Sequence, residues 1–200
     1  EYQKIIDANP DIIITCAYGQ IIPESLINYP RLGCINVHGS LLPRLRGGAP
    51  IHHAIINGDT ETGITIMYMD KHMDSGDIIA KRSLPIGPND TLDVVYEKMS
   101  KLGATLLIET LPSIVAGTND RIKQDEKYVT FGYNITKEEE KINFNNPSIK
   151  VHNLIRGLSS IPGAYCFLEE KRLKIYQSEL TNTKSTTSPG TIEKIDKTGI

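Results

Sequence analysis

The interpretation of this chain depends on the stretch Gly33-Cys34-Ile35-Asn36-Val37-His38-Gly39-Ser40-Leu41-Leu42-Pro43, in which two polar side chains interrupt an apolar strand. Asn36 and His38 are two residues apart, so on a strand they point to the same face, while Ile35 and Val37 point to the other. A Gly-Ser turn and a proline follow, which places the pair at the strand's carboxyl end, where open α/β sheets bind ligands. The alternative to a ligand site is a purely structural role, in which a hydrogen-bonded Asn and a buried His end the strand.

The pattern around this stretch alternates between strands and helices, which indicates α/β layering. We expect strands over residues 11–17, 33–38 and 63–69, and helices over 23–28 and 49–57. A long helix should begin after Asp90-Thr91 and run with apolar residues at helical spacing to Ile108. Gly103 inside it counts as a cost of about 1 kcal/mol relative to alanine.

Length and composition predict a globular protein of one large domain or two small ones, since 39% of the 200 residues are hydrophobic. The three cysteines, Cys16, Cys34 and Cys166, are widely spaced, which indicates neither a disulfide framework nor a zinc site. The apolar stretches are too short to span a membrane. We therefore expect a cytoplasmic protein with no membrane partner.

The charge balance changes sign along the chain, which suggests a domain boundary. Residues 1–122 carry 10 basic and 14 acidic side chains, and residues 123–200 carry 12 and 10. We predict a first domain over 1–122, a linker over 123–137 and a second domain over 138–200. In the second domain we expect a helix over 148–158 and strands over 164–168, 173–180 and 190–195. The abrupt start at Glu1 and the end at Ile200 suggest a fragment that lacks both ends.

Three segments together carry a family resemblance. They are Tyr18-Gly19-Gln20-Ile21-Ile22-Pro23, the stretch from Asn36 through Arg44-Leu45-Arg46-Gly47-Gly48-Ala49-Pro50, and Met73-Asp74-Ser75-Gly76-Asp77. In this order and spacing the chain resembles the folate-dependent formyltransferases, and within them the methionyl-tRNA formyltransferases. The family commonly has an aromatic residue before Pro162, where this chain has Ile161, and an alanine where it has Gly48.

The resemblance implies a partial Rossmann-like formyltransferase domain followed by a partial OB-like β-barrel domain, a fold that often binds nucleic acid. It implies a monomer that uses 10-formyltetrahydrofolate as formyl donor and initiator methionyl-tRNA as acceptor, in support of translation initiation. Formyl transfer to an amine passes through a negatively charged oxygen, for which Asn36 and His38 are the candidate hydrogen-bond donors. The resemblance selects Asp74, among the three aspartates of the acidic turn, to favour a protonated His38 and to receive the amine proton.

The resemblance also implies the substrate contacts. Two walls would hold the folate, formed by Ser40, Leu41, Leu42 and Pro43 and by Tyr18, Gly19, Gln20, Ile21 and Ile22, although leucines in such a loop can simply fill the core. Arg44 and Arg46 are candidates for folate carboxylates or tRNA phosphates, with a solvated basic turn as the alternative. Lys171, Arg172 and Lys174 are further candidates for phosphate contacts, or a solvated hairpin tip.

Several alternatives stay open at this point. The acceptor could be a small amine such as glycinamide ribonucleotide or an amino-sugar nucleotide, or water in a formyl-folate hydrolase. A non-catalytic RNA-binding protein and a dinucleotide-dependent oxidoreductase are less favoured, the latter because no GxGxxG follows a strand. No metal is expected: the acidic turn lacks the EF-hand pattern, and His52, His53, His72 and His152 are not spaced as ligands.

Overall fold

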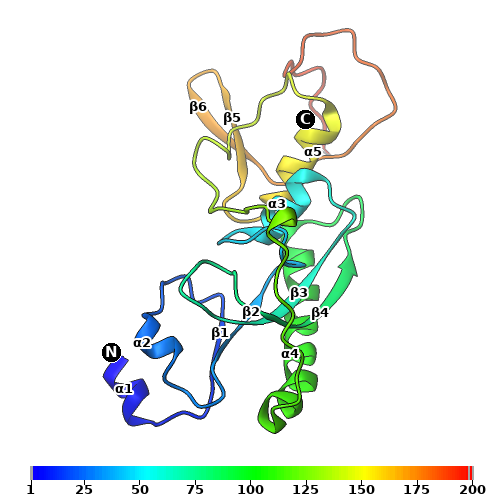
Figure 1. The fold of residues 1–200 in the computed structure, drawn as a ribbon. Coiled ribbons are helices and arrows are strands. Elements are labelled where there is room, and N and C mark those ends of the chain that lie inside the picture. The colour runs from blue at the N-terminus through cyan, green and yellow to red at the C-terminus, as the bar shows by residue number, and fades with distance from the viewer. Residues whose placement is uncertain (1, 198, 200) are drawn as a thin grey trace.

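The computed structural model describes residues 2–197 and 199, and it shows a sheet-based first part followed by a smaller second part (Figure 1). In chain order the elements are α1 (Tyr2–Asp7), β1 (Ile13–Cys16), α2 (Glu24–Ile27), β2 (Cys34–His38), α3 (Pro50–Asn57), β3 (Glu61–Tyr68), β4 (Ile78–Pro85), α4 (Leu92–Ala116), the 3₁₀ helix η1 (Glu126–Tyr128), α5 (Ser148–Gly157), β5 (Ala164–Leu168) and β6 (Lys171–Ile175).

The first part is built on a four-stranded sheet with the order β1-β2-β3-β4. The β1 strand runs parallel to β2, which pairs antiparallel with β3, and β3 pairs antiparallel with β4. Since β1 and β2 are parallel, their carboxyl ends lie at the same edge, and the segments that follow them meet there. The predicted α/β class and the first three strands are confirmed, within one to two residues at their ends.

Helix α4 covers one face of the sheet and forms the main hydrophobic core with it. Ile35 is fully buried in this core and Val37 packs against it, so this pair of β2 residues faces the helix. Gly103 of α4 lies so close to β2 that an added Cβ would come within 3.3 Å of the Val37 side chain. From the sequence, Gly103 was expected only to destabilise the helix. In the structure, its lack of a side chain permits close packing between helix and sheet.

The second part packs on the first through its helix. Helices α3 and α5 are in contact, and Ile56 of α3 packs against the small core around Ile155 and Leu158. The Arg156 guanidinium donates to the carbonyl oxygens of Gly87 (3.3 Å) and Asp90 (3.0 Å). Hydrogen bonds from a buried cation to backbone carbonyls fix α5 against the loop that precedes α4.

After the third strand, the helix that begins after Thr91, the helix over 148–158 and the strand over 164–168 are confirmed, whereas the remaining strands differ from the prediction. The β4 strand was not predicted, because its exposed charged residues Lys81 and Arg82 interrupt the apolar pattern. The strand expected over 173–180 lies at Lys171–Ile175, and no strand forms over 190–195 in the described part of the chain. In the described residues, the expected incomplete β-domain is represented by the β5–β6 hairpin and by isolated bridges between Lys141 and Tyr165 and between Asp196 and Gly199.

Within residues 2–197 and 199, no helix combines the length and the apolar character needed to cross a membrane.

A buried arginine ties the loop after β2 to the segment that leads into the second part. The Arg46 side chain is only 6% exposed, and its guanidinium bonds to Gln124 Oε1 (2.9 and 3.0 Å) and Glu126 Oε1 (2.9 Å). Its backbone amide donates to Thr130 O (2.9 Å), and its carbonyl accepts from the Gly132 amide (2.7 Å). Residues 124–132 therefore hold the loop after β2 through both the side chain and the backbone of Arg46; we call this set of contacts the clamp.

We expect Arg46→Leu to release this clamp. The free energy of unfolding should fall by about 1–2 kcal/mol, because the buried guanidinium hydrogen bonds are lost. Hydrogen exchange should show faster exchange at the amides of Arg46 and Gly132. The matched control is Arg44→Ala, which removes an exposed ion pair to Asp59 and should change stability by less than about 0.5 kcal/mol. Equal effects of the two substitutions would contradict the clamp.

Candidate functional site

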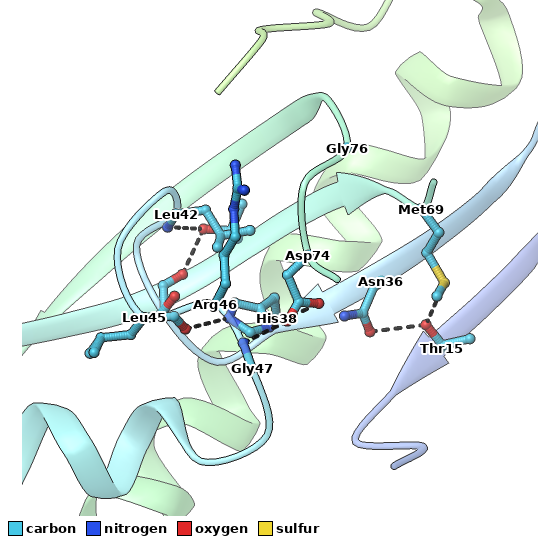
Figure 2. Close-up of polar contacts among 12 residues, drawn as sticks. Thr15, Asn36, His38, Leu42, Leu45, Arg46, Gly47, Met69, Asp74 and Gly76 are labelled. Carbon is cyan, nitrogen blue, oxygen red and sulfur yellow. Dashed lines mark hydrogen bonds and ion pairs between the residues drawn. The ribbon is translucent and has the colours of Figure 1, made fainter. Parts of the chain in front are cut away.

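The site forms where the carboxyl end of β2 meets the acidic turn between β3 and β4. Asn36 and His38 lie on the face of β2 opposite Ile35 and Val37, as the alternation predicts. Asp74 comes from the turn, and Figure 2 shows its carboxylate beside the His38 ring. The three residues selected from the sequence therefore lie in one place.

The His38 ring is held at both nitrogens. Its Nε2 lies 3.0 Å from the Leu45 carbonyl oxygen, which can only accept, so Nε2 carries the hydrogen. Its Nδ1 lies 3.6 Å from Asp74 Oδ1, and the side chain is 5% exposed. A second proton on Nδ1 would face the Asp74 carboxylate without disturbing the bond to Leu45. The geometry therefore defines which ring nitrogen faces the carboxylate.

The Asp74 carboxylate is fixed by the loop after β2. Its Oδ2 accepts a hydrogen bond from the Gly47 amide at 2.8 Å, which leaves Oδ1 for His38. The residue adopts a left-handed backbone conformation with φ of +49°, which Asp tolerates better than most residues. Gln124 stabilises this conformation by donating to the carbonyl oxygens of Asp74 (2.8 Å) and Gly76 (2.9 Å).

Gly76 gives the turn its shape. A Cβ at this position would lie 1.9 Å from the Tyr68 carbonyl oxygen, a distance that no side chain can occupy. The turn can fold back against the end of β3 only with glycine here, and this return brings Asp74 toward β2.

Thr15 orients Asn36 from the neighbouring strand. The two residues are register partners in the parallel β1–β2 pair, and Thr15 Oγ1 lies 2.9 Å from Asn36 Oδ1. The hydroxyl is farther from its other two acceptors, Ile35 O (3.2 Å) and Met69 Sδ (3.3 Å). Donation to Oδ1 turns the Asn36 amide nitrogen toward the side where His38 and Asp74 lie (Figure 2).

This arrangement combines two kinds of group that acyl transfer requires. The Asn36 amide and the His38 ring offer N–H groups of the kind that stabilise an oxygen as it becomes negative, and preorganised donors stabilise such an oxygen strongly. The Asp74 carboxylate is an acceptor for a proton released by the attacking group. The geometry suits addition of a nucleophile to a carbonyl carbon.

The residues expected to contact folate fall into two groups. Ser40 and Leu42 are fully buried: the Ser40 hydroxyl donates to Arg44 O (2.6 Å), and Leu42 packs with Met67 and Ile78. Their side chains serve the loop and the core, and Ile22 is likewise buried in a small cluster with Leu26. The remaining expected residues are exposed or half-buried and lie after β1 or β2; they are Tyr18, Gly19, Gln20, Ile21, Leu41 and Pro43.

The basic residues expected to contact tRNA are also placed differently from one another. Arg44 is exposed and pairs with Asp59. Arg46 is buried and binds Gln124 and Glu126, so its guanidinium has a structural role. On β6, Arg172 pairs with Glu140 (2.7 Å) and lies over the Tyr165 ring, while Lys174 bonds to the Pro162 carbonyl. Lys171 is exposed at the start of the strand.

Sequence reasoning missed three contributors to the site. Thr15 had a signal, since it is a polar residue in an apolar strand. The Gly47 amide and Gln124 had none, because a backbone group and a residue 50 positions from Asp74 join the site only through the tertiary fold.

Two other titratable side chains, Cys34 and His52, have pKa values shifted by burial. Burial raises the pKa of the Cys34 thiol to about 11, so it stays protonated and does not act as a nucleophile. Burial lowers the pKa of His52, which keeps that ring neutral. In the described part of the chain, no group of three or more His, Cys, Asp or Glu side chains is arranged to hold a metal ion.

Comparison with known families matches both parts of the chain. The family described as "Formyl transferase" matches residues 2–111, and "Formyl transferase, C-terminal domain" matches residues 134–200. A methionyl-tRNA formyltransferase of Staphylococcus aureus (strain MW2) is 50% identical to the chain over all 200 residues. The chain spans 64% of the length of that relative.

Solved structures share the fold. A methionyl-tRNA formyltransferase from Clostridium thermocellum superposes with a TM-score of 0.73 at 23% identity, over 92% of this chain and 78% of that one. An N-formyltransferase from Helicobacter canadensis, in complex with folinic acid and dTDP-3-aminofucose, superposes with a TM-score of 0.69 at 26% identity, over 82% of this chain and 60% of that one. With more than half of its residues matched by the family model and its site built at the end of β2, this chain belongs to the formyl transferase family.

Proposed function

We propose that this protein transfers a formyl group from 10-formyltetrahydrofolate to the α-amine of methionyl-tRNA, in support of translation initiation. The observation that carries the proposal is the meeting of Asn36, His38 and Asp74, with His38 Nδ1 3.6 Å from Asp74 Oδ1. The 50% identity to a methionyl-tRNA formyltransferase supports the acceptor, and the folinic acid held by a structural relative supports a folate donor.

In this reaction the amine nitrogen attacks the formyl carbon, and the formyl oxygen becomes negative. The Asn36 amide, already turned by Thr15, would donate a hydrogen bond to that oxygen, and a His38 ring protonated at Nδ1, the atom that faces Asp74, would stabilise the negative charge by its own positive charge. Because both side chains are fixed before the substrates bind, little reorganisation is needed as the charge develops.

The amine must also lose a proton, and Asp74 is placed to receive it directly or through water. Its Oδ2 is bound by the Gly47 amide, so the carboxylate is oriented before the substrates bind. The C–N bond to the folate nitrogen then breaks, and that nitrogen takes up a proton as the formylated amine is released.

For the acceptor we propose phosphate contacts from Arg44, at the mouth of the site, and from Lys171, Arg172 and Lys174 on β6. Arg172 has a carboxylate partner in Glu140, so a phosphate would have to compete with that ion pair. Arg46 is left out of this proposal because its guanidinium is buried and paired. We also propose a monomer acting in the cytoplasm.

Removing any of the three central groups should lower turnover without unfolding the protein. In the full-length enzyme we expect Asn36→Ala, His38→Ala and Asp74→Asn each to lower kcat by about 100-fold or more, since each removes a donor or a proton acceptor. The KM for the formyl donor should stay within several-fold. Steady-state assays with charged initiator tRNA measure both parameters.

Matched controls come from the same turn. His72→Ala removes an exposed histidine, and Asp77→Asn neutralises an aspartate paired with Arg121 (3.3 Å); both variants should keep near-normal kcat. Near-normal turnover in the Asn36, His38 or Asp74 variants would refute the assignment of these residues.

The basic residues of β6 should affect tRNA affinity rather than chemistry. We expect joint replacement of Lys171, Arg172 and Lys174 by Ala to weaken tRNA binding. The slope of the logarithm of the binding constant against the logarithm of salt concentration should become shallower by about one for each lost phosphate contact. The value of kcat at saturating tRNA should hardly change. Binding titrations over a range of salt concentrations measure the slope.

The charge-matched control is joint replacement of Arg82, Lys98 and Lys101, three ion-paired cations on β4 and α4. This control should leave the salt slope unchanged. If both triple variants bind tRNA as the wild type does, β6 does not contact the acceptor, and a small amine becomes the better candidate.

A further inference from the structure

Two exposed aromatic side chains form a flat pair in the segment that leads into the second part. The Phe131 and Tyr133 rings are stacked, with centroids 5.2 Å apart and planes 3° apart. They remain 45% and 58% exposed, respectively. Aromatic side chains usually bury most of their surface in a core, so an exposed pair suggests a binding surface. A third flat ring can stack on such a parallel pair.

The pair is held out to solvent by the backbone between the two rings. A Cβ on Gly132 would come within 3.1 Å of Pro50 Cα, so the side of Gly132 on which a side chain would stand faces α3. In an extended segment the neighbours on either side point the opposite way, which directs Phe131 and Tyr133 away from α3. The pairing of this segment with the loop at Arg46 and Ala49 fixes that orientation.

A second backbone contact links the aromatic pair to the loop that binds Asp74. A Cβ on Gly47 would lie 2.8 Å from the Gly132 carbonyl oxygen, so the two glycine backbones touch. The Gly47 amide in turn donates to Asp74 Oδ2 at 2.8 Å. The aromatic pair is therefore separated from the Asp74 carboxylate by two directly packed backbone segments.

We propose that Phe131 and Tyr133 form a stacking platform for the 3′-terminal adenine of the acceptor tRNA, an inference that rests on the proposed function. The reacting amine belongs to an amino acid esterified to the ribose of that terminal nucleotide. When the amine is beside Asp74, only an ester linkage and one ribose separate it from the adenine, and the platform adjoins the backbone that packs against Gly47, the residue that binds Asp74. Base stacking on exposed aromatic rings is a general means of holding an unpaired nucleotide.

The test measures binding of the full-length protein to two uncharged initiator tRNAs, one ending in CCA and one lacking the terminal adenosine. We expect the wild type to bind the CCA form about tenfold more tightly, and the double variant F131L/Y133L to bind both forms equally. The control Y128L removes another exposed aromatic residue of this segment, outside the pair, and should keep the tenfold preference. F131Y preserves the ring and should keep it too.

If the double variant does not fold, the single variant Y133L, which changes the more exposed ring, should still lose several-fold of the preference. A wild type without preference, or a double variant that keeps it, would overturn the platform. A raised KM for the formyl donor with an unchanged CCA preference would also overturn it, since the pair would then serve the folate. Failure of the wild type to formylate methionyl-tRNA would instead refute the proposed function, because the binding test involves no formyl transfer.

Discussion

The hydrogen bond from the Gly47 amide to the Asp74 carboxylate is the contact on which the site depends. Asn36 and His38 come from β2, whereas Asp74 comes from a turn almost 40 residues later, and nothing in the local chain brings them together. The bond joins the loop after β2 to that turn and leaves one carboxylate oxygen free for His38. Its geometry rests on Gly76, which lets the turn fold back, and on the clamp that fixes the loop at Arg46.

Much of this could be predicted from the sequence, for a local reason. The alternation of Asn36 and His38 with Ile35 and Val37 lies within one strand, and a period of two fixes which side chains share a face whatever the tertiary fold. The choice of Asp74 was of another kind, since composition does not distinguish it from Asp70 and Asp77. The family resemblance made that choice, and the structure places Asp74 beside His38.

What could not be predicted depends on contacts between distant segments. Arg44 and Arg46 look alike in sequence, yet one is exposed and the other is buried by partners almost 80 residues away. Leu42 looked like a ligand contact, and its side chain completes a core with Met67 and Ile78. Beyond residue 175 the polar composition made short strands hard to place, and the strand expected over 190–195 does not form. The domain boundaries at 122 and 137 stay a prediction.

The clamp around Arg46 also limits how far the two parts of this protein can be exchanged with those of its relatives. The residues that hold this guanidinium, Gln124 and Glu126, follow the last helix of the first part, and so does the backbone that pairs with the loop at Thr130 and Gly132. A chimera that joined a foreign second part at residue 122 would leave a buried cation without its partners, which is strongly destabilising. Exchange of the second part between relatives must therefore keep residues 124–132 with the first, so the exchangeable unit begins only after residue 132.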